Sequence, residues 1–238
     1  MVHDQTRVRT GYEVLLVDLD GTVVDYDRTE DAALRDVHGA YFEGRLPLGE
    51  FRRAFHRAND ELWAAYRRRE IDLDRLRVER FARLGAHPTP PGRLAALFER
   101  RLGHRVTLFA DALPALRALA QVTRLVLVTD GIAAVQHAKL RRSRIRALFE
   151  HVVVSTEVGH RKPDPRLLRY ALALAGAEPR RALVVGDSQV SDGEGARRAG
   201  LDFCWVNRGG AGRGEARHVV PDLLALVPLL TRPAVPVP

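Results

Sequence analysis

The amino-acid sequence predicts an α/β protein in which a doubly wound, Rossmann-like parallel sheet carries an inserted all-helical domain. Three observations lead to this prediction. Short apolar runs alternate with helical patterns over most of the chain, which is typical of strands joined by crossover helices. Residues 29–105 contain helical patterns alone, and acidic residues directly follow several of the apolar runs.

The predicted strands are short, continuous apolar runs. Such runs are typical of strands that are buried on both faces of a parallel sheet. They cover Glu13–Leu19, Arg124–Thr129, His151–Ser155, Ala182–Gly186 and Asp202–Asn207.

The predicted helices lie between these runs and after the last of them. They cover Ala110–Ala120, Ala133–Leu148, Pro165–Ala175, Gly193–Ala199 and Pro221–Leu230. Gly200 directly follows one of these helices, and glycine is the usual residue just beyond a helix C-terminus.

The long stretch without strand patterns predicts a separate domain. It consists of arginine-rich amphipathic segments, which are interrupted by Pro47 and by the proline-rich His87–Gly92. We therefore expect an α/β core domain of residues 1–27 and 106–238, with a helical cap domain of residues 28–105 inserted into it.

Composition favours a globular protein in a reducing compartment. Of the 238 residues 46% are hydrophobic and 29% are charged, as in folded soluble domains. No apolar stretch is long enough for a signal peptide or a membrane span, so we expect no membrane partner. The single cysteine, Cys204, cannot form an internal disulfide, which favours the cytoplasm, and we expect it to be buried in a strand.

The net charge of +8 raises the question of nucleic-acid binding. The basic residues are 36 arginines and two lysines, Lys139 and Lys162. The arginines are scattered and form no stripe interleaved with aromatic residues. We therefore expect no nucleic-acid polymer as a partner, and a positive field of this kind attracts small phosphorylated metabolites.

The first candidate site follows the first predicted strand. Asp18 and Asp20 flank Leu19, and Gly21 allows the backbone to turn sharply. Ligands of open α/β sheets bind at the carboxyl ends of the strands, so these two carboxylates are placed to bind a cation. A pair of this kind also occurs in the metal–nucleotide sites of unrelated enzymes.

Two further candidate sites lie later in the chain. Thr129, Asp130 and Gly131 follow the second predicted strand and open a helix, whose first amides form a cradle for phosphate. Lys162 lies in the segment Gly159–Pro165, and a lysine in this arginine-rich chain suggests a need for a compact charge. A simple helix cap and a solvated loop lysine are the alternative interpretations of the two features.

The fourth candidate site is the segment that follows Ala182–Gly186. It contains Asp187, Ser188 and Asp192, which add two carboxylates and a hydroxyl beside a glycine. An Asx turn with a helix N-cap is the alternative interpretation. Taken together, the four sites bring to one edge of the sheet the hard oxygen ligands that a divalent cation prefers, with a phosphate facing it.

The motifs DLDGT, TDG, RKPDP and GDSQVSD resemble, in order and approximate spacing, those of the haloacid dehalogenase-like superfamily of phosphohydrolases. This resemblance covers residues 12–26 and 105–230 and implies a helical cap over the active site. It implies that Asp18 is the nucleophile and that Asp20 is the general acid and base. It also implies phosphate binding by Thr129, Asp130, Gly131 and Lys162, and Mg²⁺ binding by Asp18, Asp20 and Asp187 with support from Asp192 and Ser188.

A narrower resemblance concerns the substrate. The segments AGLDFCWVN, TDGIAAVQHAKL and STEVGHRKPDP are similar to the branch of 5′-nucleotidases that act on pyrimidine and noncanonical nucleotides. A nucleoside 5′-monophosphate is therefore the leading expected substrate. Asp130 stands where these relatives usually carry asparagine, so either its carboxylate faces away from the phosphate or the substrate preference differs.

Other functions share this set of motifs. They are phosphatases for phosphoglycolate or sugar phosphates, then sugar phosphomutases, then haloacid dehalogenases. Asp20 counts against a dehalogenase, because a halide leaves without being protonated. A binding protein that merely uses the fold would not need all of the acidic residues and Lys162. We expect a monomer or a homodimer.

The expected cap offers one set of candidate specificity residues. Phe55, Trp63 and Tyr66, together with Arg67–Arg69, could stack on a base and bind an acidic group. The same spacing is typical of a packed helical core, and we prefer that interpretation.

Overall fold

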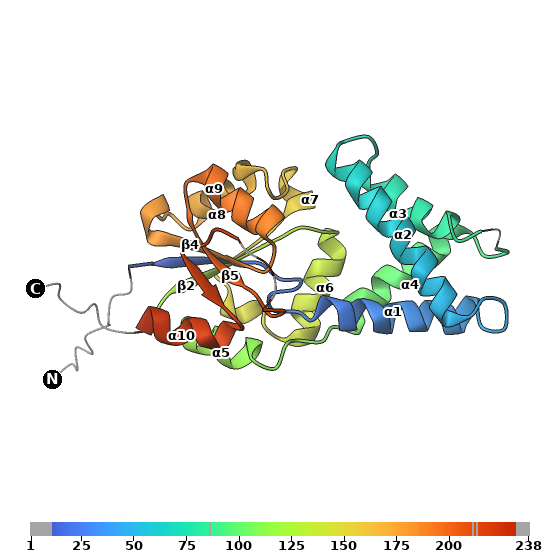
Figure 1. The fold of residues 1–238 in the computed structure, drawn as a ribbon, viewed down its shortest axis with the longest axis horizontal. Coiled ribbons are helices and arrows are strands. Elements are labelled where there is room, and N and C mark those ends of the chain that lie inside the picture. Colours follow the sequence, from blue (N-terminus) through green and yellow to red (C-terminus); the bar gives the residue numbers. More distant parts are fainter. Residues whose placement is uncertain (1–10, 86, 211, 213, 232–238) are drawn as a thin grey trace, which may run out of the picture. The chain divides into compact units, whose positions relative to one another are not determined.

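The computed structural model describes residues 11–85, 87–210, 212 and 214–231 (Figure 1). Contacts divide the chain into two compact units. The sheet unit ends at Tyr26 and resumes at Val106, and the helical unit is Asp27–Arg105.

A parallel sheet forms the centre of the sheet unit. Within the described residues its strands lie in the order β3-β2-β1-β4-β5-β6, and every neighbouring pair is parallel. They are β1 (Val14–Val17), β2 (Arg124–Thr129), β3 (His151–Val154), β4 (Ala182–Gly186), β5 (Asp202–Val206) and β6 (His218–Val220). The predicted parallel α/β fold is thereby confirmed. The prediction missed β6, an edge strand of three residues that is too short to form an apolar run.

Helices cover both faces of this sheet. They are α5 (Ala112–Leu119), α6 (Ala133–Ser143), α7 (Ser155–Val158), α8 (Pro165–Leu174), α9 (Glu194–Ala199) and α10 (Leu223–Thr231). Figure 1 shows α8 and α9 on one face of the sheet and α5 and α10 on the other.

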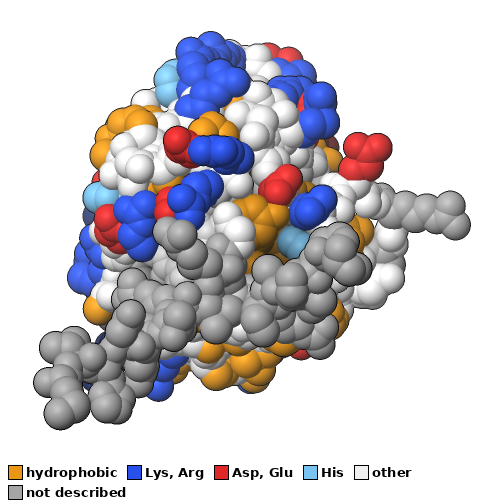
Figure 2. Space-filling view, turned by 90° about the vertical axis from the view of Figure 1, so that its left-hand side faces the viewer, with side chains coloured by type: hydrophobic (Ala, Val, Ile, Leu, Met, Phe, Trp, Pro, Cys, Tyr) orange, Lys and Arg blue, Asp and Glu red, His pale blue; other side chains and the backbone are white. Residues whose placement is uncertain are grey.

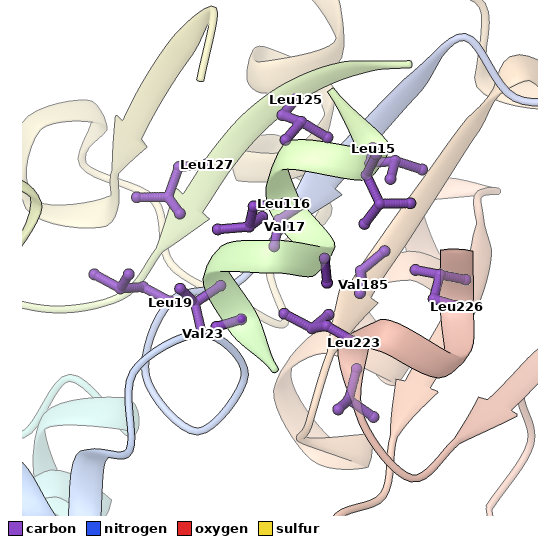
Figure 3. Packing of buried hydrophobic residues seen from close by; sticks show 14 of the residues in the cluster. Leu15, Val17, Leu19, Val23, Leu116, Leu125, Leu127, Val185, Leu223 and Leu226 are labelled. Atoms are coloured by element: carbon purple, nitrogen blue, oxygen red, sulfur yellow. The ribbon is translucent and has the colours of Figure 1, made fainter. Parts of the chain in front are cut away.

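The alternation of side chains along β1 explains why this strand is apolar throughout. Leu15 and Val17 pack with α5 and α10 in one buried cluster (Figure 3). Val14 and Leu16 pack with α8 in a second cluster on the opposite face. Complete burial of one such side chain stabilises the fold by roughly 1.5–3 kcal/mol, so a polar substitution on either face would be costly.

One predicted helix is wrong at its C-terminus. The pattern predicted a continuous helix over Ala133–Leu148, but α6 ends at Ser143 and a separate 3₁₀ turn covers Arg146–Leu148. Between them Arg144 adopts a left-handed conformation with φ of 58°. The break allows Ile145 to be buried in the cluster beneath α5, a constraint that helical periodicity does not reveal.

The start of α9 also differs from the expectation. A π-helical turn, Gln189–Gly193, precedes it, so the helix begins at Glu194. At its other end Gly200 has φ of 74° and caps the helix, as predicted.

The helical unit contains four long helices and no strand among its described residues. They are α1 (Tyr26–Tyr41), whose first residue belongs to the sheet unit, α2 (Leu48–Arg67), α3 (Leu73–Ala82) and α4 (Pro91–His104). Helix α2 starts directly after Pro47, and α4 has Pro91 as its first residue. Both positions suit proline, which lacks the amide hydrogen that a helix interior requires.

Phenylalanines fill the interior of this unit around one buried arginine. Arg80 is only 2% exposed, and its guanidinium carbon lies 4.7 Å from the ring centre of Phe98 and 5.7 Å from those of Phe55 and Phe81. Contacts of this kind offset part of the cost of burying the charge. Phe55 therefore belongs to the interior of the helical unit, as the preferred interpretation predicted.

The other candidate specificity residues of this unit remain accessible. Trp63 and Tyr66 are partly exposed and pack edge to face, with ring centres 5.6 Å apart. Arg68 donates two hydrogen bonds to Glu70, so this arginine is already paired with a carboxylate.

On the face drawn in Figure 2, basic side chains lie among acidic ones and form no continuous stripe. Among the helices of the described residues, none combines the length and the hydropathy that crossing a bilayer requires. Cys204 is buried in β5, and burial raises the pKa of its thiol to about 12.

Candidate functional site

Three neighbouring strands end at the same edge of the sheet and bring the predicted residues together. Val17, the last residue of β1, pairs with Leu127 of β2 and with Val185 of β4. Asp18 directly follows β1, Thr129 is the last residue of β2, and Asp187 directly follows β4. Residues that lie far apart in the sequence thus meet because their strands are adjacent and in register.

Lys162 links two of the buried carboxylates. Its Nζ donates to Oδ1 of Asp18 at 2.5 Å and to Oδ1 of Asp192 at 2.6 Å. It also donates to the backbone carbonyl of Val128 at 3.3 Å. Lys162 is 4% exposed and precedes a cis peptide bond to Pro163. It is therefore a buried site residue and not a solvated loop lysine.

Three carboxylates gather around this lysine. Oxygen atoms of Asp18, Asp187 and Asp192 all lie within 4.8 Å of one another. Burial raises the pKa of Asp18 well above its ordinary value, and the charges of Asp192 and Asp187 add to this effect. Burial, followed by the charge of Asp192, raises the pKa of Asp187 to about 6. Both shifts arise first from burial and then from the neighbouring carboxylates.

The same crowding explains the charge state of Lys162. Burial alone would lower the pKa of its ammonium, but the carboxylates of Asp18, Asp192 and Asp130 raise that pKa well above its ordinary value. Lys162 is therefore a fixed positive charge. One ammonium among three close carboxylates leaves the cluster with an excess of negative charge, which suits a divalent cation held by oxygen ligands.

Short polar contacts hold the two later aspartates in place. The backbone amide of Ser188 donates to Oδ2 of Asp192 at 3.1 Å, and the hydroxyl of Ser188 accepts from the amide of Ser191. The hydroxyl of Thr22 donates to Oδ1 of Asp187 at 3.3 Å. Ser188 thus orients Asp192 and does not itself belong to the carboxylate cluster.

Two glycines make room for these carboxylates. A Cβ atom on Gly21, which has φ of 90°, would lie 2.4 Å from Oδ2 of Asp187. A Cβ atom on Gly186 would lie 2.3 Å from Oδ2 of Asp192. Both distances are shorter than any van der Waals contact, so the sequence requires glycine at both positions.

We expect Gly186→Ala to lower the free energy of unfolding by about 1–3 kcal/mol, because Asp192 is fully enclosed and cannot move aside. Gly39→Ala in α1 is the matched control, since a Cβ atom there would meet nothing within 4 Å. Alanine favours a helix over glycine, so the control should stabilise the protein by up to about 1 kcal/mol. Urea unfolding measures both; equal stability of the Gly186 variant and the wild type would contradict the argument.

Asp20 lies outside the carboxylate cluster. Nζ of Lys139 donates to both of its carboxylate oxygens at 2.7 Å, and Nε2 of Gln136 donates to Oδ2 at 2.9 Å. β1 ends at Val17, so strand alternation does not determine the direction of the Asp20 side chain. The two acidic residues of the first motif therefore bind different lysines.

The Thr129–Gly131 segment forms the turn before α6. The hydroxyl of Thr129 accepts a hydrogen bond of 2.7 Å from Nε2 of Gln136. Oδ1 of Asp130 accepts from the backbone amide of Lys162 at 3.2 Å, and burial raises the pKa of Asp130. The Asp130 carboxylate thus binds the loop that carries Lys162. The amide of Gly131 donates to the hydroxyl of Ser155 at 3.3 Å.

Sequence reasoning missed Lys139 and Gln136. The rarity of lysine, which singled out Lys162, applies equally to Lys139, since these are the two lysines of the chain. Gln136 and Lys139 are three residues apart on α6, a spacing that places them on the same helix face. Without knowledge of what this face contacts, the sequence gives no reason to assign either residue to the site.

The family described as haloacid dehalogenase-like hydrolase matches residues 12–200. The chain is 28% identical over 201 residues to the HAD-hydrolase YfnB of Bacillus subtilis, covering 82% of this chain and 84% of YfnB. A crystal structure of YfnB bound to magnesium matches with a TM-score of 0.81 and 26% identity, over 93% of this chain and 99% of that one.

Two further relatives have names that state a substrate. The chain is 33% identical over 155 residues to the pyrimidine 5′-nucleotidase YjjG of Escherichia coli, covering 64% of this chain and 69% of YjjG. It is 33% identical over 239 residues to a phosphoserine phosphatase of Thermus thermophilus, covering 89% of this chain and 94% of that protein.

Proposed function

This chain belongs to the haloacid dehalogenase-like hydrolase family and is a phosphoric monoester hydrolase, and we propose that it works with Mg²⁺ and with Asp18 as the nucleophile. The buried Lys162, which binds Asp18 and Asp192 beside Asp187, carries this proposal. Together these four residues supply the proposed nucleophile, a fixed positive charge and a set of oxygen ligands within one small volume.

The reaction has two steps. In the first, a carboxylate oxygen of Asp18 bonds to phosphorus and the P–O bond to the leaving alcohol breaks, while Asp20 gives its proton to the leaving oxygen. In the second, water attacks the phosphorus of the aspartyl-phosphate and returns a proton to Asp20. The bond to Asp18 breaks and inorganic phosphate leaves. Covalent catalysis of this kind divides one difficult hydrolysis into two easier steps.

The residues around Asp18 determine how a phosphate can approach it. Lys162 offsets the negative charge of both the nucleophile and the incoming dianion. Thr129 and the amides at the start of α6 are the proposed donors to the other phosphate oxygens. Proton transfer by a positioned carboxyl such as Asp20 typically contributes 10²–10⁴-fold to the rate.

The donor set fits Mg²⁺. Asp18 and Asp187, with Asp192, offer hard carboxylate oxygens within 4.8 Å of one another, and burial together with the charge of Asp192 raises the pKa of Asp187. The Asp20 carboxylate is hydrogen-bonded to Lys139, and we propose Asp192 as a further acidic residue of the metal site beside Asp18, Asp20 and Asp187. When bound, Mg²⁺ would reduce the repulsion between Asp18 and the phosphate.

A nucleoside 5′-monophosphate is the substrate that we propose first, supported by the similarity to YjjG. The contact of Asp130 with the Lys162 loop supports this choice, because we expect the hydrogen bond from the Lys162 amide to hold this carboxylate away from a bound phosphate. The second candidate is a small phosphorylated metabolite of another class, supported by the longer match to the phosphoserine phosphatase.

Phosphate release with Mg²⁺ tests the proposal. The panel contains nucleoside 5′-monophosphates, phosphoserine, phosphoglycolate, sugar phosphates and 4-nitrophenyl phosphate. We expect turnover of the panel with the highest kcat/KM for a nucleotide. The highest kcat/KM for another member would move the substrate to that class, and no phosphate release from any ester would reject the proposed function.

A further inference from the structure

Lys139 is one of the most completely enclosed charges in the described part of the molecule. It is 1% exposed, although it lies on a helix with exposed arginines near its C-terminal end. Its ammonium group contacts both oxygens of Asp20 at 2.7 Å and lies 5.1 Å from the ring centre of Tyr26. These contacts leave the ammonium group directed at one carboxylate.

Gln136 lies one turn earlier on the same face of α6. Its Nε2 donates to Oδ2 of Asp20 at 2.9 Å, to the hydroxyl of Thr129 at 2.7 Å and to the carbonyl of Asp130 at 3.1 Å. One buried amide thus joins the Asp20 carboxylate to the segment that is proposed to bind phosphate. Lys139 and Gln136 together form what we call the Asp20 anchor.

Stability alone does not account for the Asp20 anchor. Taking an ammonium out of water costs several kcal/mol, and a buried ion pair is on average no more stabilising than well-packed apolar residues. The chain has lysine only at positions 139 and 162 and arginine at its 36 other basic positions, and both lysines are buried against carboxylates. The ammonium contacts both oxygens of the Asp20 carboxylate from a single nitrogen atom, as a compact point charge does, whereas a guanidinium would bind through a planar fork of two nitrogens.

We propose that Lys139, assisted by Gln136, is a positioning residue that fixes the Asp20 carboxyl group for proton transfer to the leaving oxygen. The inference rests on the proposed function and adds a residue outside the four sequence motifs. A carboxyl group accepts hydrogen bonds whether ionised or protonated, so the same two donors can hold Asp20 before and after it gives up its proton.

Leaving groups of different acidity test this role. An alkoxide needs a proton to leave, whereas 4-nitrophenolate leaves without one. Lys139→Met keeps an unbranched side chain that is one atom shorter and removes the charge. We expect this variant to lower kcat/KM by about 10²-fold for an alkyl phosphate and by less than about 10-fold for 4-nitrophenyl phosphate. The parameter kcat/KM measures the steps up to and including the first chemical step, in which the alcohol leaves.

Two further variants keep the test decisive. Gln136→Met removes one donor at nearly constant volume. It should lower kcat/KM for the alkyl phosphate more than for 4-nitrophenyl phosphate, with losses about a tenth as large as those of Lys139→Met. Lys139→Arg restores the charge and should recover part of the alkyl phosphate activity. Arg142→Met, at an exposed basic position on the same helix, is the matched control and should behave as the wild type. Circular dichroism checks the folding of each variant.

The outcomes separate this inference from the proposed function. Equal losses for both esters, or unchanged kcat/KM with only a lower melting temperature, would show a merely structural role and overturn the inference. If Lys139→Met does not fold, Gln136→Met alone decides the question. An equal loss of kcat/KM for the alkyl and the aryl ester in that variant would overturn the inference. A wild type that hydrolyses neither ester would reject the proposed function, and the inference with it.

Discussion

Replacing Asp18 with asparagine is expected to lower kcat by at least about 10³-fold for every phosphate ester while the protein stays folded. An amide does not form the proposed aspartyl-phosphate, so the whole covalent route is lost and not only one contact. The loss should therefore be of similar size for alkyl and aryl phosphates, in contrast to the variants of the Asp20 anchor.

The fold should tolerate this substitution for a specific reason. Burial raises the pKa of Asp18, which means that the surroundings already disfavour its ionised form. Asparagine has nearly the same shape, and Lys162 retains its contacts with Asp192 and with the carbonyl of Val128. Asp18→Asn should consequently unfold within a few degrees of the wild type.

Phosphate release and thermal unfolding measure the two parts of this prediction. Asp202→Asn is the matched control, because Asp202 is an exposed aspartate at the first residue of β5. The control should keep the wild-type rate. An Asp18→Asn enzyme that retains half of the wild-type rate would refute the assignment of the nucleophile.

Removal of divalent cations has the second largest expected effect. Dialysis against EDTA should abolish phosphate release, and added Mg²⁺ should restore it. Without a cation, three carboxylates within 4.8 Å of one another are balanced by Lys162 alone, and an incoming phosphate adds further negative charge. Full turnover in EDTA would rule out the proposed mechanism.

Binding of Mg²⁺ can also be followed without activity. A ligand that binds the folded state alone stabilises it by about 2.7 kcal/mol at 100 times its Kd, so the melting temperature should rise as Mg²⁺ is added. Asp187→Asn removes one proposed ligand and should remove most of this rise, whereas Asp202→Asn should keep it. An equal rise in both variants would place the bound metal elsewhere.

The sequence predicted the interior strands of the sheet best. The expected bounds of β2 and β4 agree with the structure, because both strands are buried over nearly their whole length and therefore apolar throughout. The prediction failed where tertiary contacts decide the local structure. The end of α6 at Ser143 depends on the burial of Ile145, and the short edge strand β6 depends on pairing with β5.

In the candidate site too, the sequence predicted some features, whereas others depend on tertiary contacts. Strand ends and glycines indicated the positions of Asp18, Thr129 and Asp187, and adjacency of the strands brings these residues together in the structure. The contacts that Asp20 makes were not predictable, because Lys139 follows it by 119 residues and lies on a helix whose inner face the sequence alone does not identify. Their roles in catalysis stay predictions that the experiments above address.

The burial of both lysines makes the chain unusual as a target for amine-directed reagents. Lys139 and Lys162 are its only lysines, and neither exposes more than 4% of its surface. Amine-directed acylating agents should therefore leave both lysines of the native protein unmodified, and an attempt to attach the protein to a surface through lysine would fail. Modification of either lysine would in turn show that this edge of the sheet has opened, so mass spectrometry after brief acylation becomes a direct assay for local unfolding at the candidate site.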